Sequence, residues 1–210
     1  MFYSVMDSPL GALTLSSTNH GLAAVRFGNC VPEGSLIDSG RNAEPMQQLE
    51  KYFSGDLQHF DLDLDLSGTP FQEAVWQELL KIPYGETRSY GDIARQLEKP
   101  GASRAVGAAN HQNPIAIIVP CHRVVGSGGK LTGYAGGLPR KKALLELEAR
   151  FRDMRALEGD HVIEAMVVKV PRAAAKTAPA AKSKGLAKAS RPRSEEHTSE
   201  LQSRGLSSYA

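Results

Sequence analysis

Cys121 and the residues beside it are the part of the chain whose residue types best fit covalent chemistry. A thiol stands between a proline and an imidazole in the segment Pro120-Cys121-His122. A proline fixes its own φ and has no amide donor, which suits a sharp turn that presents the next side chain to a pocket. Free cysteines are also among the most buried residue types, so Cys121 could be a plain packing residue. The neighbouring base favours a reactive thiolate.

A carboxylate further along the chain could complete a relay with these two residues. Glu148 lies in a predicted last helix over residues 140–150, where it could orient the His122 imidazole. Adjacent residues of a strand point to opposite faces, so direct contact between Cys121 and His122 is not expected. We therefore predict a bridging water between the thiol and the imidazole.

Three motifs occur together around the thiol: Asn113-Pro114-Ile115, the run 120–124 and the run 133–137. Together they resemble the signature of the methylated-DNA protein-cysteine methyltransferases, and the similarity runs from about residue 71 to residue 148. The resemblance implies a DNA repair protein that flips out O6-alkylguanine and transfers the alkyl group irreversibly to its own cysteine. O4-alkylthymine is a second candidate lesion. Each molecule would act once, on double-stranded DNA, as a monomer and without a cofactor.

The resemblance also implies a role for each candidate catalytic residue. Cys121 would be the alkyl acceptor, and His122 and Glu148 would activate it. Asn113 would hold the turn that carries the cysteine. Tyr134 would line the guanine pocket and donate at N3, where a phenol can relieve the negative charge that develops as the base leaves.

Contact with DNA is implied as well, because an O6 atom inside a duplex is out of reach of a protein thiolate. Arg104 would enter the base stack in place of the extruded nucleotide, and Tyr90 would help to rotate its phosphate. The predicted DNA-binding residues are Tyr90, Arg104, Ala105, Gly107 and Arg123. The predicted substrate pocket consists of Val119, Tyr134, Ala135 and Gly136.

Residues 1–67 are predicted to form an α/β domain with a small antiparallel sheet. A helix is predicted over 43–54 from its apolar spacing. The alternating run Asp61 to Leu66 predicts an exposed or edge strand rather than a metal site. The predicted strands of the sheet are 2–6, 12–16 and 22–27.

Residues 68–150 are predicted to form a mainly helical, winged-helix-like domain with a helix-turn-helix. Thr69-Pro70 begins one helix, Ser89 to Asp92 forms a capping box for the next, and another begins near Ala102. The small side chains of that last helix permit a close approach, either to a neighbouring helix or to another surface. The resemblance implies that the surface is the minor groove of DNA. A short buried strand is predicted over 115–119.

Charge is divided unevenly along the chain. Residues 1–67 contain three basic and nine acidic side chains, whereas residues 68–150 contain eleven and seven. This asymmetry favours contact between the second segment and a polyanion. The two cysteines lie far apart in the sequence, which predicts a cytoplasmic protein without a zinc site. No apolar run is long enough to span a bilayer, so no membrane segment is predicted.

Residues 151–210 are predicted to be a disordered basic tail. Between 165 and 193 there are eight Lys or Arg residues and no Asp or Glu, so the tail could attract phosphates without reading sequence. Residues 193–203 look like a translated sequencing adapter, and we exclude residues 193–210 from functional reasoning.

Three other functions compete with alkyl transfer. A DNA-binding relative that recognises alkylguanine without removing the alkyl group would lack the acceptor, so Cys121 argues against it. A winged-helix regulator with a structural or redox-sensing cysteine would not require Asn113, Tyr134 and Glu148 together. A cysteine hydrolase would release its covalent intermediate with water, whereas a thioether is stable, and stoichiometry separates the two.

Overall fold

The N-terminal sheet is built from short runs of β-prone residues. The computed structural model describes residues 1–158. Strands β1 (Phe2–Met6), β2 (Leu13–Ser17) and β3 (Leu22–Phe27) pair antiparallel in chain order, which confirms the predicted meander. A short strand that we did not predict, β4 (Leu36–Ile37), pairs parallel with β1. The sheet, in the order β3-β2-β1-β4, is therefore mixed rather than purely antiparallel.

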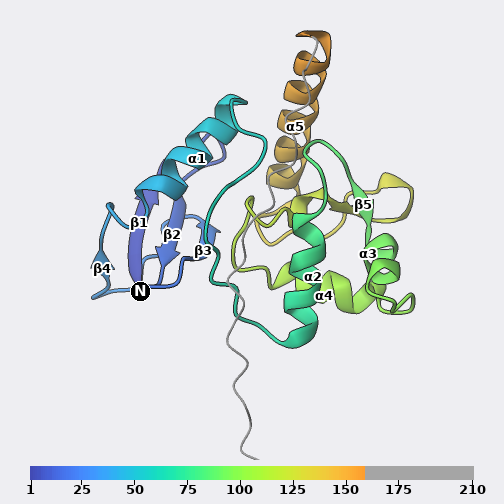
Figure 1. Cartoon of the computed structure of the whole chain (residues 1–210), viewed down its shortest axis with the longest axis horizontal. Coiled ribbons are helices and arrows are strands. Elements are labelled where there is room, and N and C mark those ends of the chain that lie inside the picture. Colours follow the sequence, from blue (N-terminus) through green and yellow to red (C-terminus); the bar gives the residue numbers. More distant parts are fainter. Residues whose placement is uncertain (159–210) are drawn as a thin grey trace, which may run out of the picture. The chain divides into compact units, whose positions relative to one another are not determined.

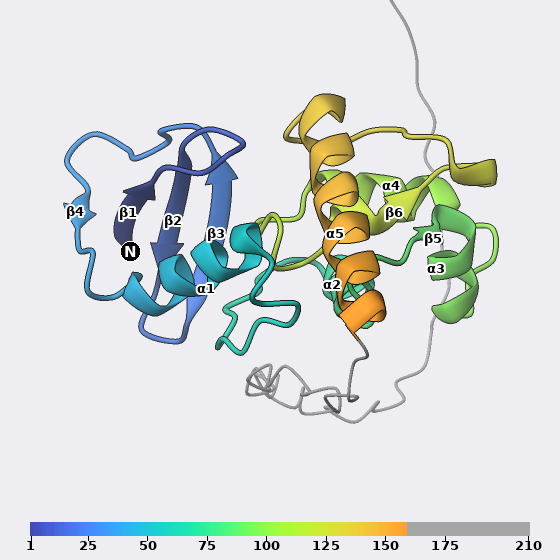
Figure 2. The same ribbon diagram turned by 90° about the horizontal axis from the view of Figure 1, so that it is seen from above.

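Helix α1 (Ala43–Ser54) lies against this sheet in both views (Figures 1 and 2) and has the predicted bounds. Its apolar face includes Leu49 and Tyr52, both fully buried. Gly55 ends the helix with a φ of 86°, a left-handed conformation that favours glycine. A Cβ on Gly55 would also lie 2.3 Å from Cδ1 of Phe151, so the last helix passes very close to the end of α1.

The Asp-Leu run does not form the strand that we predicted. Only Leu64 makes a β-bridge, with Leu22, and the segment is otherwise extended chain without a ladder. The alternation of burial holds, since Leu62 and Leu64 are buried while Asp61 and Asp63 are exposed. The pattern indicated which side chains face the core, but the backbone pairs with β3 only at Leu22, through Leu22 N to Asp63 O and Asp65 N to Leu22 O, both at 2.9 Å, so no ladder forms.

Between residues 67 and 158 the structure has four further α-helices: α2 (Pro70–Leu80), α3 (Tyr90–Gln96), α4 (Ser103–His111) and α5 (Leu138–Glu158). Capping boxes begin α2 at Thr69 and α3 at Ser89, as the sequence predicts. Helices α3 and α4 pack together as the predicted helix-turn-helix. Helix α5 continues past its predicted end at residue 150, so residues 151–158 are helical and do not belong to the tail. Residues 159–210, including the adapter-like segment, lie outside the described residues.

The segment before Cys121 is a series of turns, not the predicted strand. Only Ile115 makes a bridge, with Val25 of β3, and Val119 N donates to Ile115 O at 3.1 Å. Ile117 has a φ of 73°, which is rare for a β-branched residue and indicates a tightly constrained backbone. The prediction failed because a buried apolar run of this length is typical of both strands and tight buried turns.

Short elements connect this turn to its surroundings. A 3₁₀ helix, η1 (Cys121–Arg123), begins at the cysteine, and β6 (Val124–Val125) follows it. Strand β6 pairs parallel with β5 (Arg88–Ser89), which leads directly into α3. A second 3₁₀ helix, η2 (Ser127–Gly129), begins the loop that returns to α5. The Ile115–Val25 bridge attaches the cysteine segment to the N-terminal sheet, and the β5–β6 pairing attaches it to the helix-turn-helix.

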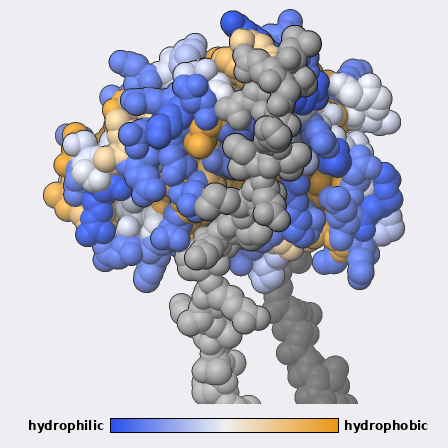
Figure 3. All heavy atoms as spheres, turned by 45° about the horizontal axis from the view of Figure 1, so that its top comes forward, coloured by the Kyte–Doolittle hydropathy of each residue, from blue (hydrophilic) through white to orange (hydrophobic). Residues whose placement is uncertain are grey.

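A single hydrophobic cluster extends from the sheet to helix α5. On the face that Figure 3 shows, hydrophilic side chains predominate and apolar atoms occur in small scattered areas. Among residues 1–158, no helix is both long enough and apolar enough to span a bilayer.

Candidate active site

Cys121 lies where two cavities meet. Its side chain is 6% exposed, and it lines a larger cavity of about 390 Å³ and a smaller one of about 270 Å³. Helix α4 and the loop before α5 contribute to both cavities, strand β3 contributes to the larger one, and α3 contributes to the smaller one. Both cavities are lined by Asn110, His111, Cys121 and Tyr134.

Asn113 holds the turn that carries the thiol. Its Nδ2 donates to Val119 O at 2.8 Å and to Cys121 Sγ at 3.1 Å. Its Oδ1 accepts a hydrogen bond from Ile115 N at 3.1 Å. One carboxamide thus connects the start of the turn, the end of the turn and the sulfur.

The electrostatic surroundings of Cys121 keep it protonated until a base acts. Burial raises the pKa of the Cys121 thiol, while the Asn113 hydrogen bond and the positive charge of Lys141 oppose that rise. The pKa remains above its usual value. A proton acceptor is therefore needed to form the thiolate at neutral pH.

His122, the next residue in the chain, is the candidate acceptor, although within residues 1–158 it makes no direct hydrogen bond to the Cys121 sulfur. Its ring is fully buried, and Nε2 lies 2.8 Å from Oε1 of Glu148. Burial lowers the pKa of His122 although Glu148 opposes this, so the imidazole is neutral at rest. A carboxylate only accepts hydrogen bonds, so Nε2 carries the proton and Nδ1 holds a free lone pair. Among residues 1–158, Nδ1 has no hydrogen-bond partner.

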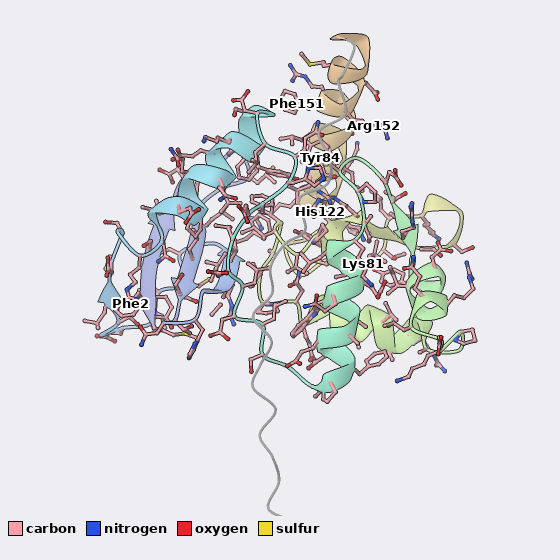
Figure 4. All side chains as sticks on the ribbon, in the orientation of Figure 1. Phe2, Lys81, Tyr84, His122, Phe151 and Arg152 are labelled. Carbon is pink, nitrogen blue, oxygen red and sulfur yellow. The ribbon has the colours of Figure 1, made fainter. Side chains whose placement is uncertain are left out.

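Glu148 is the centre of a buried polar network beside α5, where Figure 4 places His122 and Tyr84. Besides His122, its carboxylate accepts from Tyr52 Oη at 2.7 Å, Gly85 N at 3.0 Å and two nitrogens of Arg123 at 2.9 Å. Burial by itself raises the pKa of Glu148, but His122 and Arg123 hold it well below its usual range. The carboxylate therefore stays ionised.

Arg123 does not lie where a DNA-binding residue would. It is 6% exposed, and its guanidinium is committed to Glu148 and to Ile82 O, which accepts from Nη1 at 2.6 Å. The prediction that Arg123 contacts DNA is wrong for this reason. A buried arginine of this kind neutralises the carboxylate that orients the imidazole.

Tyr134 lies in the loop that leads into α5 and faces both cavities. Its ring meets Phe27 of β3 edge to face, with 6.1 Å between the centroids. Burial raises the pKa of its hydroxyl, which has no hydrogen-bond partner among the described residues. The phenol is therefore a neutral donor that can serve a bound molecule.

The other predicted pocket residues divide into two groups. Ala135 and Gly136 line the larger cavity next to Tyr134. Val119 is fully buried and lines neither cavity, and its carbonyl accepts hydrogen bonds from Asn113 and from Cys121 N. Val119 therefore shapes the turn rather than the pocket.

The structure also reveals Lys141, which our sequence reasoning missed. It is fully buried, and its Nζ donates to Val124 O at 2.6 Å and to Thr132 O at 2.8 Å. Burial lowers the pKa of Lys141, and Cys121 opposes this. The signal was present in the spacing, because Lys141, Leu144 and Glu148 occupy one face of a helix.

Helix α4 carries three candidate DNA-binding residues, of which two lie outside the cavities and one lines the smaller cavity. Arg104 and Ala105 are exposed, whereas Gly107 lines the smaller cavity together with Tyr90. A Cβ on Gly107 would lie 3.8 Å from the Tyr90 ring. No group of three or more metal-ligating side chains that could hold an ion occurs within the described part of the chain.

Comparison with known proteins assigns most of the described chain to two family models. Residues 1–66 match the ribonuclease-like domain of 6-O-methylguanine DNA methyltransferase, and residues 70–150 match its DNA binding domain. A methylated-DNA--protein-cysteine methyltransferase of Mycobacterium tuberculosis is 56% identical over 150 residues, which are 70% of this chain and 91% of that protein.

Other relatives agree with this match. The protein of the same name from Methanosarcina acetivorans is 50% identical over 153 residues, covering 70% of this chain and 98% of that protein. The crystal structure of Mycobacterium tuberculosis OGT in complex with DNA superimposes with a TM-score of 0.69 at 54% identity, covering 72% of this chain and 94% of the other.

Proposed function

Because this chain belongs to the 6-O-methylguanine DNA methyltransferase family, we propose that it repairs DNA by moving an alkyl group from O6 of a damaged guanine onto Cys121. One observation carries the proposal for this chain: a buried thiol lines two cavities, and the next residue in the chain is a neutral imidazole that a carboxylate orients. This arrangement can generate a thiolate where a base can be held.

Activation begins with His122. Its Nδ1 takes the Cys121 proton through a bridging water, and Glu148 stabilises the imidazolium that results. The thiolate attacks the alkyl carbon, so an S–C bond forms as the C–O6 bond breaks and its electron pair passes to the purine. The Tyr134 hydroxyl donates at N3 and relieves the developing negative charge. The thioether is stable, which limits each molecule to one transfer.

Access to O6 requires the nucleotide to leave the duplex. Arg104 and Ala105 occupy the exposed face of α4, from which an arginine can enter the base stack. Tyr90 and Gly107 line the smaller cavity, which Cys121 lines as well. We assign residues 1–67 and 68–150 to two domains, and we expect a monomer that acts in the cytoplasm on O6-alkylguanine in double-stranded DNA.

Transfer stoichiometry tests the proposal. Duplex DNA with a labelled methyl group on O6 of one guanine should transfer at most one methyl per protein, and peptide mass spectrometry should locate it on Cys121 and not on Cys30. Cys121→Ala should transfer none. Repeated turnover would indicate a cysteine hydrolase instead, and full transfer by Cys121→Ala would exclude Cys121 as the acceptor.

A further inference from the structure

Asn110 is a buried polar side chain whose hydrogen-bonding capacity is unused. It lies near the end of α4 and is 7% exposed, and neither Nδ2 nor Oδ1 has a hydrogen-bond partner among residues 1–158. Buried amides are nearly always paired, because an unpaired one costs stability. An apolar residue would fit the folded chain better, so the carboxamide needs a ligand to account for it.

The position of Asn110 indicates where that ligand binds. It lines both cavities that meet at Cys121. Two hydroxyls on the wall of the smaller cavity, those of Thr132 and Tyr134, likewise have no partner within the described residues. Three unsatisfied polar side chains therefore surround the space next to the thiol, as expected where a molecule with its own donors and acceptors binds.

The chemistry of the damaged base matches a carboxamide. Alkylation at O6 removes the proton from N1, so the N1 position changes from a donor to an acceptor, while the neighbouring 2-amino group remains a donor. A carboxamide presents a donor and an acceptor side by side and can pair with such an edge through two hydrogen bonds. Unmodified guanine presents two donors there, and one of them would face the Asn110 amino group.

We propose that Asn110 reads the extruded base, with Nδ2 donating to N1 and Oδ1 accepting from the 2-amino group. The assignment rests on the proposed alkyl-transfer function. It is consistent with the order of atoms on the base, because O6 follows N1 along the edge and Cys121 lines the same cavities. Asn110 would then favour alkylated guanine over the intact guanines that surround it in DNA.

Single-turnover kinetics with two substrates test this assignment. One duplex contains O6-methylguanine, and the other contains O6-methylhypoxanthine, which lacks the 2-amino group. The wild-type protein should transfer methyl from O6-methylguanine about tenfold faster or more, the discrimination typical of a bidentate pair. Asn110→Leu should slow transfer from O6-methylguanine by a similar factor and should react with both substrates at nearly equal rates.

Thermal unfolding separates this role from a structural one. Asn110→Leu removes an unpaired buried amide, so its Tm should equal or exceed that of the wild type. The matched control is Asn42→Leu, because Asn42 is fully buried but paired with Ser17 at 2.6 Å and Ser4 at 3.0 Å. That variant should lose stability and keep the substrate preference.

Each remaining outcome is decisive. Equal rates of the wild-type protein on the two substrates, or an unchanged preference in Asn110→Leu, would overturn the assignment while leaving alkyl transfer intact. A wild-type protein that transfers no methyl from either duplex would instead refute the proposed function itself.

Discussion

The phenol of Tyr52 and the imidazole of His122 share one carboxylate oxygen: Oε1 of Glu148 lies 2.7 Å from Tyr52 Oη and 2.8 Å from His122 Nε2. Tyr52 belongs to α1, on the N-terminal sheet, whereas Glu148 belongs to α5. Burial raises the pKa of Tyr52 well above its usual value, so its hydroxyl remains a donor. The N-terminal part of the chain therefore contributes directly to the network that orients the base.

Tyr52→Phe should shift the pH dependence of alkyl transfer. With one donor fewer, the Glu148 carboxylate attracts the His122 imidazolium more strongly, so the pKa of His122 rises. The acid limb of the plot of rate against pH should therefore move to higher pH. The rate at neutral pH should fall about two- to tenfold, which corresponds to the net free energy of one hydrogen bond. Tyr3→Phe is the control, because the Tyr3 hydroxyl donates to Met1 Sδ at 3.5 Å and not to Glu148 among residues 1–158. An unshifted acid limb would show that Tyr52 is merely structural.

Glu148→Gln should destabilise the fold, because it leaves Arg123 as an uncompensated buried charge. We expect the free energy of unfolding at pH 7 to fall by about 3–5 kcal/mol, measured by urea unfolding. The folded-state pKa of Glu148 is depressed, so its stabilisation is full above the usual glutamate pKa of about 4.3 and is lost as the pH falls below it. The difference in unfolding free energy between the wild type and Glu148→Gln should therefore become smaller in acid. A difference that does not change with pH would contradict the depressed pKa of Glu148.

Gly136→Ala should displace the pocket loop. A Cβ at this position would lie 2.7 Å from Phe27 Cδ2 and 2.8 Å from Tyr134 Cε1, closer than atoms can approach. We expect a loss of about 1–3 kcal/mol in thermal unfolding and slower alkyl transfer, since the Tyr134 ring must move. Ala135→Ser, at an exposed position of the same loop, should change stability by no more than about 0.5 kcal/mol. Equal stability of both variants would mean that the loop is free to shift.

Arg104→Ala should impair repair of duplex DNA more than reaction with the free O6-alkylguanine base. The arginine would offset part of the unstacking cost, which is a few kcal/mol, so we expect a loss of about tenfold or more on the duplex. Arg41→Ala removes an exposed arginine from the N-terminal part and serves as the charge-matched control. Equal losses on duplex and free base would argue against a role for Arg104 in extrusion.

Local patterns predicted most of the elements. Strands β1 and β3, helix α1 and the capped starts of α2 and α3 follow from alternation, helical spacing and cap residues that lie within a few positions of one another. The same patterns could not distinguish a strand from turns over residues 115–119 or provide a partner strand for residues 61–66. Those outcomes depend on segments that are distant in the sequence.

The sequence alone determined the acceptor candidate Cys121, the adjacent base and the carboxylate, because these are marked by residue type and by a specific motif. Only the tertiary structure decided which groups surround the carboxylate. It buries Arg123 against Glu148 instead of exposing it to DNA, and it brings Tyr52 to the same oxygen. The packing of distant elements decides whether a buried polar group pairs within the protein or remains available to a ligand. A short stretch of sequence does not determine that packing.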